Sequence, residues 1–354
     1  MNPLAGTIKK LQDMIVAHPD VPEALKMRGF EQLARAALSM QYGGNGASFE
    51  IVEKYIEFMC QLPWNVESAD NLDIAKAHQV IDSKHYGLPK VKERMMEYLA
   101  SVILVKKENP RAIFRAPSLL FVGLAGTGKT TFAHIIAETL GRKSYLIPFG
   151  GLSQALDLRG YSKTSPYAQP GLILKALAHC GSRNPVIILD ELDRGHGNDG
   201  AGIMGALLEI LDHNQNATFT DYFLDYPFNL SQVMFIGTAN NTREISTAVL
   251  DRMEIIEMPT YNDQEKIAIG KTYVLPREAQ EAGLKSEQLV IDDDVWPKLV
   301  RPLGFEPGIR SLERLIESVV RKVALHIVSH DYDSVRITTE NMYNYVDMTF
   351  ASNS

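Results

Sequence analysis

Apolar side chains recur at helical spacing in the first part of the chain. Ile8 and Leu11 are three residues apart, and the same periodicity returns from Ile51 onward. The glycine-rich stretch 43–46 between these regions favours a turn, because glycine tolerates the backbone angles that tight turns require. We therefore predict an N-terminal helical segment over residues 1–65.

The pattern changes near residue 118, where short apolar runs begin to alternate with helical stretches. Strands that alternate with helices predict βαβ units, in which a parallel sheet carries helices on both faces. We therefore predict an α/β domain over residues 66–260. The predicted strands are the runs 118–124, 144–149, 185–190, 232–239 and 254–258.

Helical periodicity returns after residue 262, and prolines and glycines interrupt it between residues 302 and 308. Proline breaks a helix and glycine weakens one, so this stretch predicts a break in the helical region. We predict an all-helical C-terminal domain over residues 261–354. The chain shows no internal repeat and no low-complexity tract.

A phosphate-binding motif follows the first predicted strand. Residues 123–130 match GxxxxGK[ST], after an apolar strand and before a helical run. The glycines let successive backbone N–H groups face an anion, and the following helix adds its positive end. We expect Lys129 to reach the β- and γ-phosphates of ATP and Thr130 to place its hydroxyl on Mg²⁺. The expected ATP-binding residues of this loop are Gly123, Gly126, Thr127, Gly128, Lys129, Thr130 and Thr131.

Polar residues also follow two later strands, at the end where ligands bind in open α/β sheets. Asp190 is expected to hold Mg²⁺ through water, and Glu191 to orient and polarise the attacking water. Asn240 could hydrogen-bond the γ-phosphate or that water, and its alternative role is in an asparagine-rich turn. The sequence therefore predicts an ATPase with ATP and Mg²⁺ as cofactors.

Charge and composition narrow the class of protein further. The formal net charge of −7 gives no general reason to expect nucleic-acid binding, which usually shows as a basic domain. Cys60 and Cys180 are too few for a disulfide framework or a zinc site, so we expect small buried packing residues. No window is long and apolar enough to span a membrane, and the start lacks a targeting signal. We expect a cytoplasmic protein with no membrane partner.

The order of the three polar elements resembles the AAA+ ATPase module, and the surrounding sequence resembles the Lon protease family within it. The resemblance covers about residues 62–350. It implies a P-loop NTPase core with a C-terminal helical lid domain. The segments that carry it are HYGLPKVKERMMEYLA at 85–100, PFGG at 148–151, DELD at 190–193, the stretch 206–240, LDRMEIIEM at 250–258 and GIRSLER at 308–314.

The resemblance implies roles for residues at matching positions. Asn240 falls on the sensor-1 residue of the family, which favours the catalytic role over the turn. Arg310 falls on the sensor-2 arginine of the lid, and Tyr86 and Gly87 fall where the family frames the adenine. These four residues therefore join the expected nucleotide site.

Arg252 falls on the arginine finger of the family. Such a residue reaches the γ-phosphate of a neighbouring subunit and stabilises charge in the transition state. The alternative is a surface arginine that pairs with Asp251 or Glu254. An arginine finger requires a partner subunit, so the resemblance implies a homo-oligomeric ring, most often a hexamer.

The resemblance implies an ATPase that remodels or unfolds protein substrates. Lon proteases also carry an N-terminal substrate-recognition domain and a C-terminal serine–lysine protease domain. No stretch of this chain resembles the nucleophile motif of that protease, so we expect no peptidase activity from these residues and a separate peptidase or effector as a partner. The chain is expected to be either a natural ATPase-only relative or the ATPase fragment of a full ATP-dependent Lon protease.

Two other classes of function stay open at this point. A nucleotide-switched scaffold or regulatory ATPase would bind ATP, assemble and recruit a separate effector, with turnover incidental. A nucleic-acid motor or loader is the third hypothesis, because related AAA+ rings act on nucleic acids. The acidic composition and the Lon-specific segments argue against that third class.

The expected pore loop departs from the family pattern. Lon-type rings grip substrate with an aromatic residue followed by an apolar one, shortly before a Pro-Gly pair. Alignment on the Pro-Gly at 170–171 places a serine and a proline at those positions. Tyr167 comes next, so we expect either a displaced gripping aromatic or a loop tyrosine packed locally. The charges of Arg159 and Lys163 could instead suit an acidic partner.

Overall fold

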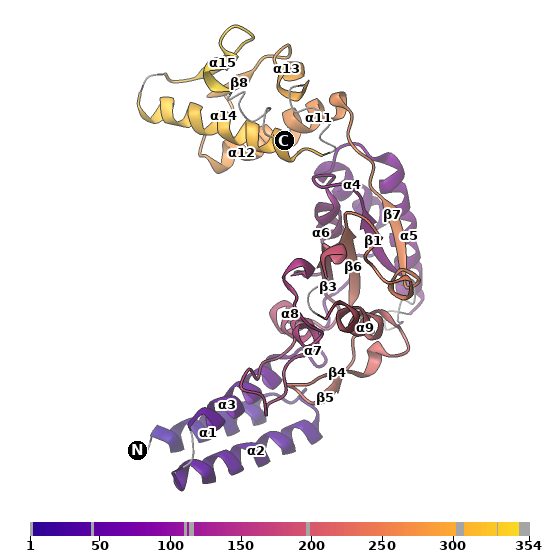
Figure 1. Ribbon diagram of the computed structural model, residues 1–354, viewed down its shortest axis with the longest axis vertical. Helices are drawn as coiled ribbons and strands as arrows, with labels where there is room; N and C mark the ends of the chain where they lie inside the picture. The colour runs from indigo at the N-terminus through magenta and orange to yellow at the C-terminus, as the bar shows by residue number, and fades with distance from the viewer. Residues whose placement is uncertain are drawn as a thin grey trace. The chain divides into compact units, whose positions relative to one another are not determined.

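The computed structural model shows a chain that folds into two compact units, drawn in Figure 1. Unit 1 comprises Met1–Val80, Arg94–Val122 and Thr130–Ile256, and unit 2 comprises Ile81–Glu93, Gly123–Lys129 and Glu257–Ser354. The residues that the structure describes are 3–43, 46–109, 112, 117–195, 199–301, 308–330 and 332–346.

The N-terminal segment is helical, as predicted. Its helices are α1 (Pro3–Ala17), α2 (Glu23–Gln41) and α3 (Gly46–Gln61). Figure 1 shows them side by side. Leu11, Ile15 and Ile56 are fully buried and belong to the same hydrophobic core as the sheet of unit 1. These helices therefore fold onto the rest of the unit and form part of one continuous core.

A five-stranded sheet forms the centre of unit 1, in the order β2-β3-β6-β1-β7. Parallel pairing joins β2 to β3, β3 to β6 and β6 to β1. The five strands are those predicted from the apolar runs, with small shifts at their ends. Their bounds are β1 (Ser118–Val122), β2 (Ser144–Pro148), β3 (Val186–Asp190), β6 (Met234–Ala239) and β7 (Met253–Glu257).

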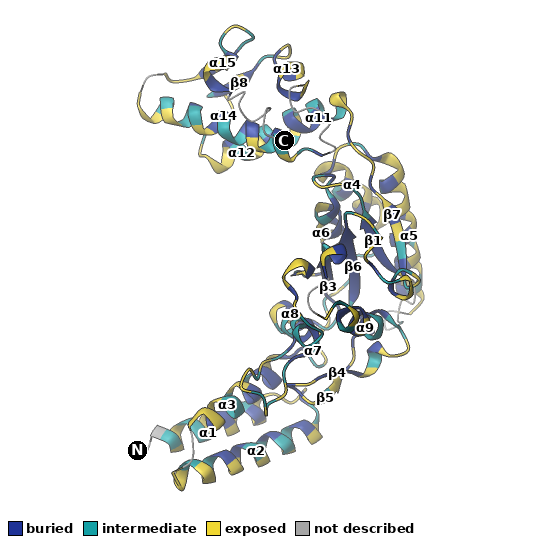
Figure 2. Ribbon diagram, viewed as in Figure 1, coloured by how far each residue is buried: buried dark blue, intermediate teal, exposed yellow. Residues whose placement is uncertain are grey.

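Helices connect the strands and pack on the sheet. Phe121 of β1 stacks on Phe132 of α6 with 5.9 Å between ring centroids. Figure 2 shows the central strands β3, β6 and β1 almost entirely buried, which explains why their sequences are continuous apolar runs. The edge strands β2 and β7 are partly exposed. No helix among the described residues is long and apolar enough to cross a membrane. The helices of this part are α4 (Ile74–Lys84), α5 (Pro89–Glu108), α6 (Lys129–Thr139), α7 (Leu156–Arg159), α8 (Leu172–Cys180), α9 (Gly200–Leu211) and α10 (Thr247–Leu250), with 3₁₀ turns at Phe149–Gly151, Leu192–Arg194 and Asn216–Thr218.

A short hairpin extends unit 1 beyond the sheet. Its strands β4 (Phe219–Asp221) and β5 (Tyr226–Phe228) pair antiparallel. Trp64 packs against it, with ring centroids 5.1 Å from Phe228. The apolar pattern did not predict this hairpin, because three-residue strands are too short to show an alternation.

The lid in unit 2 is mainly helical, as predicted, but it also contains a small parallel sheet. Strands β8 (Leu289–Ile291) and β9 (Val335–Ile337) are too short to have been predicted. The predicted break at 302–308 lies outside the described residues except for Gly308. The helices are α11 (Asp263–Ile269), a π-helix (Gly270–Val274), α12 (Leu275–Glu281), α13 (Trp296–Val300), α14 (Arg310–Val328) and α15 (Met342–Tyr345).

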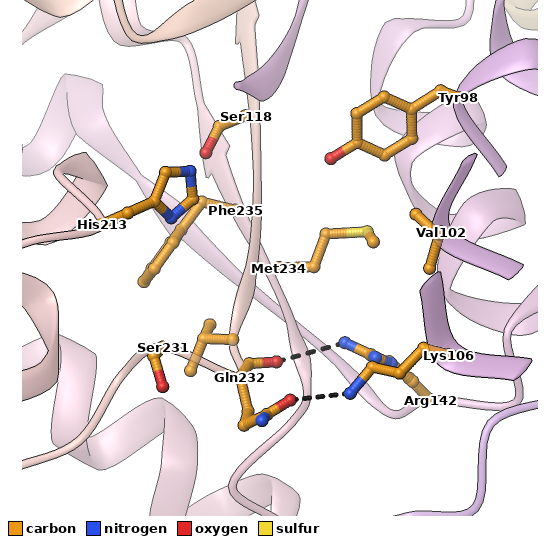
Figure 3. Close-up of a pocket in the computed structure, with 11 residues that line it drawn as sticks. Tyr98, Val102, Lys106, Ser118, Arg142, His213, Ser231, Gln232, Met234 and Phe235 are labelled. Carbon is orange, nitrogen blue, oxygen red and sulfur yellow. Dashed lines mark hydrogen bonds between the residues drawn. The ribbon is translucent and has the colours of Figure 1, made fainter. Parts of the chain in front are cut away.

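A polar cluster lies at the amino ends of β1 and β6, and Figure 3 shows it. Arg142 binds both oxygens of Asp70 at 2.7 Å, and its Nη1 donates to the carbonyl oxygen of Gln232 at 3.2 Å. Lys106 donates to Oε1 of Gln232 at 2.9 Å. The adjoining cavity of about 30 Å³ has roughly the volume of a water molecule, so the cluster is structural.

Replacing Asp70 with alanine leaves Arg142 buried without its carboxylate partner. The two side chains are 10% and 3% exposed, so we expect the free energy of unfolding to fall by about 3 kcal/mol. Urea unfolding followed by circular dichroism measures the loss. Glu31→Ala is the matched control, because its pair with Arg35 is exposed and worth less than about 0.5 kcal/mol. Equal losses in the two variants would contradict this account.

Candidate functional site

The glycines of the phosphate motif adopt backbone angles that other residues rarely take. Gly126 and Gly128 have φ of 78° and 90°, in the left-handed region that favours glycine. Gly123 has no room for a side chain, because a Cβ atom there would lie 2.6 Å from the carbonyl oxygen of Met258. The loop leads into α6, which begins at Lys129. The backbone thus forms a tight turn before a helix N-terminus, which suits phosphate binding.

Lys129 is buried, and its amine lies against the loop. Its Nζ donates to the carbonyl oxygens of Gly123 at 2.7 Å and Leu124 at 3.0 Å. Thr127 Oγ1 also donates to Leu124 at 2.9 Å. Thr131 is exposed in the first turn of α6. These bonds place the positive charge of Lys129 beside the loop that the motif assigns to phosphate.

The start of α14 lies against the same loop. The backbone N–H of Ile309 donates to the carbonyl oxygen of Gly126 at 3.2 Å. A Cβ atom on Gly126 would lie 3.2 Å from Cγ of Arg310, and one on Gly308 would lie 2.3 Å from the carbonyl oxygen of Ala125. The structure therefore brings Arg310, the predicted lid arginine, next to the phosphate motif.

A buried tyrosine–histidine pair supports the loop. Tyr261 donates its hydroxyl proton to the carbonyl oxygen of Thr127 at 3.0 Å, and its oxygen lies 2.9 Å from Nε2 of His85. Because the hydroxyl has only one proton, Nε2 of His85 carries the proton that joins the two side chains. Burial, with the charge of Lys92, lowers the pKa of His85 from 6.5 to about 4. His85 is therefore neutral at physiological pH.

Tyr86 and Gly87 follow this histidine directly. The side chain of Tyr86 is 40% exposed, so part of its ring is available to a ligand. Gly87 has φ of 71°, and a Cβ atom there would lie 3.4 Å from Oε1 of Glu265. The sequence singled out these two residues for the adenine and missed His85 and Tyr261, because no motif links 85 with 261.

The carboxylate of Asp190 is the centre of a hydrogen-bond chain at the carboxyl ends of β3 and β6. Its Oδ1 accepts hydrogen bonds from Thr130 Oγ1 at 2.9 Å and Thr238 Oγ1 at 2.6 Å. The Thr238 oxygen accepts the backbone N–H of Glu191 at 3.0 Å. Thr238 is fully buried and therefore positions both acidic residues. No sequence motif pointed to this threonine, because its role depends on contacts with residues about fifty positions away.

Glu191 occupies a strained backbone position. Its φ of 56° and ψ of 51° lie in the left-handed region, which is uncommon for a residue with a side chain. Its Oε2 lies 3.1 Å from Nη1 of Arg194. A Cβ atom on Gly150 would lie 3.5 Å from the same oxygen, at van der Waals distance, so Gly150 packs beside this carboxylate.

Asn240 lies just beyond the end of β6. Its backbone N–H donates to Oδ2 of Asp193 at 3.1 Å, and Nδ2 of Asn241 donates to the same oxygen at 3.4 Å. Asp193 is buried in the turn after β3. Asp193 therefore anchors the segment that carries Asn240 beside the segment that carries Glu191.

Arg252 makes contacts within its own chain. Its Nε and Nη2 donate to Oδ2 of Asp212 at 3.2 Å and 3.1 Å, and Nη1 donates to the carbonyl oxygen of Ala248 at 2.9 Å. The expected alternative partner Glu254 pairs with Arg94 instead. The side chain of Arg252 is still 35% exposed, so a neighbouring molecule can reach it.

Tyr167 is 75% exposed and does not belong to any of the nucleotide motifs. Arg159 pairs with Glu209, and the amine of Lys163 lies 3.9 Å from the centroid of the Tyr55 ring. Both charges therefore have contacts within the chain, and the hypothesis that they serve an acidic partner stays a prediction.

The donor set fits a nucleotide with Mg²⁺. The Thr130 hydroxyl and the Asp190 carboxylate are hard oxygen ligands, and Mg²⁺ is usually bound by one or two such groups together with substrate phosphates. The loop N–H groups and Lys129 suit the phosphates. Among the described residues, no group of three or more histidine, cysteine and acidic side chains could hold a metal ion without such help.

Comparisons with known proteins identify the families that this chain resembles. The chain matches the ATPase family associated with various cellular activities (AAA) over residues 119–260 and the Lon protease AAA+ ATPase lid domain over residues 280–335. It is similar to Lon protease of Lawsonia intracellularis, with 39% identity over 348 residues, which cover 96% of this chain and 41% of that protein. The predicted resemblance is therefore confirmed.

Two further relatives show the same extent of similarity. Lon protease 2 of Thermus thermophilus is 39% identical over 334 residues, which cover 92% of this chain and 41% of that protein. Lon protease of Dictyoglomus thermophilum is 38% identical over 347 residues, which cover 98% of this chain and 43% of that protein. The chain thus spans only 41–43% of the length of these relatives.

The neutral state of His85 makes stability depend on pH. Its pKa is lowered in the folded chain, so the unfolded chain takes up a proton first as the pH falls below 6.5. We expect this residue to contribute a loss of up to about 3 kcal/mol between pH 6.5 and about 4. Urea unfolding at a series of pH values, compared with His85→Gln, measures that contribution.

His134→Gln is the control, because His134 is exposed. It should leave the pH dependence of the free energy of unfolding unchanged. If the free energy of unfolding changes with pH equally in His85→Gln and in the unaltered protein, His85 is not the group responsible.

Proposed function

This chain belongs to the Lon family through its AAA ATPase and lid domains, and from that premise we propose that it hydrolyses ATP with Mg²⁺ to remodel or unfold protein substrates. The observation that carries the proposal is the hydrogen-bonded set of Thr130, Asp190, Thr238 and Glu191. The nucleotide-binding domain comprises residues 66–260 and the lid comprises 261–354. The family match to an AAA domain and a Lon lid supports this division.

Each residue of the site has a role in hydrolysis that follows from its chemistry. Lys129 and the N–H groups of its loop bind the phosphates, and Tyr86 frames the base. Thr130 and Asp190 hold Mg²⁺, which neutralises phosphate charge when it is bound. Glu191 orients the attacking water and takes up its proton.

One contact of Glu191 must change before that step. Glu191 exchanges its ion pair with Arg194 for a hydrogen bond to water. Asn240 contributes a second polar contact to the water or the γ-phosphate. Arg310, which lies beside Gly126, links the lid to the phosphate loop.

Arg252 completes the site of a neighbouring subunit in this proposal. Its guanidinium leaves Asp212 and stabilises the charge that develops on the partner's γ-phosphate. The partial exposure of Arg252 supports this role. A residue that acts on a neighbour requires a homo-oligomeric ring, and we propose a hexamer.

The substrate is a polypeptide in this proposal, and Tyr167 contacts it. The names of the relatives describe them as proteases, and this chain spans 41–43% of their length. We assign remodelling of that polypeptide to the ATPase and lid domains of this chain. The exposure of Tyr167 supports its contact with substrate.

Two substitutions separate nucleotide binding from turnover. Lys129→Ala removes a charged hydrogen-bond donor and should weaken ATP binding by about 10- to 100-fold. Glu191→Gln keeps the shape but not the base, and should preserve binding while turnover falls by about 10²- to 10⁴-fold. Binding of a fluorescent ATP analogue and phosphate release measure the two effects. Full turnover by Glu191→Gln at saturating ATP would contradict the proposal.

Mixing two inactive variants tests action between subunits. Arg252→Ala should lower turnover by about 10³-fold or more, the usual effect of losing an arginine finger. A mixture of Arg252→Ala and Glu191→Gln should recover part of the activity, because some interfaces then combine an intact Glu191 with an intact Arg252. Arg321→Ala, at an exposed pair within α14, should keep normal turnover. A mixture as inactive as its components would exclude the arginine-finger role.

A further inference from the structure

Lys163 carries a buried charge in an unusual setting. Its Nζ is buried and makes no hydrogen bond with any residue in the described part of the chain. The amine lies over the Tyr55 ring, 3.9 Å from the centroid. Burial lowers the pKa of Lys163, Asp225 opposes this shift and Arg28 adds to it. A buried charge is costly unless another interaction compensates for it, and the aromatic face supplies that interaction here.

The Tyr55 ring is held in place by its surroundings. Tyr55 lies on α3 and is fully buried. Phe223 meets its edge with 6.0 Å between ring centroids, and the backbone N–H of Phe223 donates to Asp221 at 2.8 Å. Arg28 of α2 pairs with Asp225 in the turn of the hairpin at 3.0 Å. The face that receives Lys163 is therefore fixed by the packing of the N-terminal helices on the hairpin.

The segment 161–171 carries Lys163 and Tyr167, and its base is closed at two points. The backbone N–H of Tyr161 donates to the carbonyl oxygen of Gln169 at 2.8 Å. The backbone N–H of Gly171 donates to Oδ2 of the buried Asp221 at 2.7 Å. These bonds fix where the segment leaves and rejoins the fold, but they leave its middle to be held by other contacts.

A groove separates the middle of this segment from α3. Its volume is about 740 Å³, and its walls include Phe58 and Lys54 on one side and Tyr167 on the other. Continuous side-chain packing therefore does not hold Tyr167 against α3. The contact of Lys163 with Tyr55 bridges the same two elements, so it can set their separation.

We propose that Lys163 is a positioning residue that clamps the segment 161–171 to the N-terminal helices through the ring of Tyr55, and so determines where Tyr167 is presented to a polypeptide. The functional part of this inference rests on the proposed action on protein substrates. The clamp joins Lys163 to Tyr55 of α3, more than a hundred positions away in sequence. In this proposal, a movement of α3 therefore displaces the segment that carries Tyr167.

Chymotrypsin cleavage after Tyr167, identified by mass spectrometry on the full chain, measures how firmly the segment is held. Lys163→Met keeps the aliphatic stem and removes the charge, and Tyr55→Leu removes the aromatic face. Each should raise the cleavage rate about tenfold, because the segment then opens more often. Tyr55→Phe is the matched control and should be cleaved at the normal rate, because it keeps the ring face.

The double variant gives a second criterion. Lys163→Met combined with Tyr55→Leu should be cleaved no faster than the quicker single variant, because both changes remove one contact. The clamp would be overturned if the cleavage rate of the double variant rose by the product of the two single increases. A normal cleavage rate in Lys163→Met would also overturn it. Since Tyr55→Leu also removes core volume, Lys163→Met is the variant that decides.

ATP turnover with and without unfolded casein tests the functional consequence. Lys163→Met should keep the basal rate and lose most of the stimulation by casein, whereas Tyr55→Phe should keep both. Faster cleavage with undiminished stimulation would overturn the role of the clamp in presenting Tyr167. If casein does not stimulate the unaltered protein, the proposed protein substrate is wrong, and the cleavage rates still decide whether the clamp exists.

Discussion

The hydrogen bond between Thr238 and Asp190 is the interaction on which the arrangement of the site depends. It exists because β3 and β6 are parallel neighbours, with Leu189 opposite Gly237, so their carboxyl ends meet. The same threonine oxygen accepts the N–H of Glu191, whose left-handed backbone would otherwise be costly to maintain. A single buried hydroxyl thus positions both acidic residues.

Residues of its own unit hold the phosphate loop in place through hydrogen bonds. Tyr261 and Ile309 donate hydrogen bonds to the carbonyl oxygens of Thr127 and Gly126. Both donors belong to the part of the chain that leads into or begins a lid helix. A change in the lid therefore reaches the loop through backbone hydrogen bonds, and neutral His85 supports this link without adding a charge beside the phosphates.

Three cations near functional segments already have partners in the single chain. Arg194 pairs with Glu191, Arg252 with Asp212, and Lys163 with the ring of Tyr55. The first two contacts must be exchanged before the proposed chemistry proceeds, whereas the third must persist to present Tyr167. This difference follows from burial, because the amine of Lys163 is buried and the guanidinium groups of the two arginines are partly exposed.

The sequence by itself determined the five strands of the sheet, the N-terminal helices and the positions of the phosphate motif and the acidic pair. Continuous apolar runs and fixed motif spacing are local signals, so one chain suffices to recognise them. Only the tertiary structure revealed the roles of Thr238, His85, Tyr261 and Lys163. Each acts through a contact with a residue about fifty or more positions away, and no local pattern encodes which distant side chains the packing of a fold brings together.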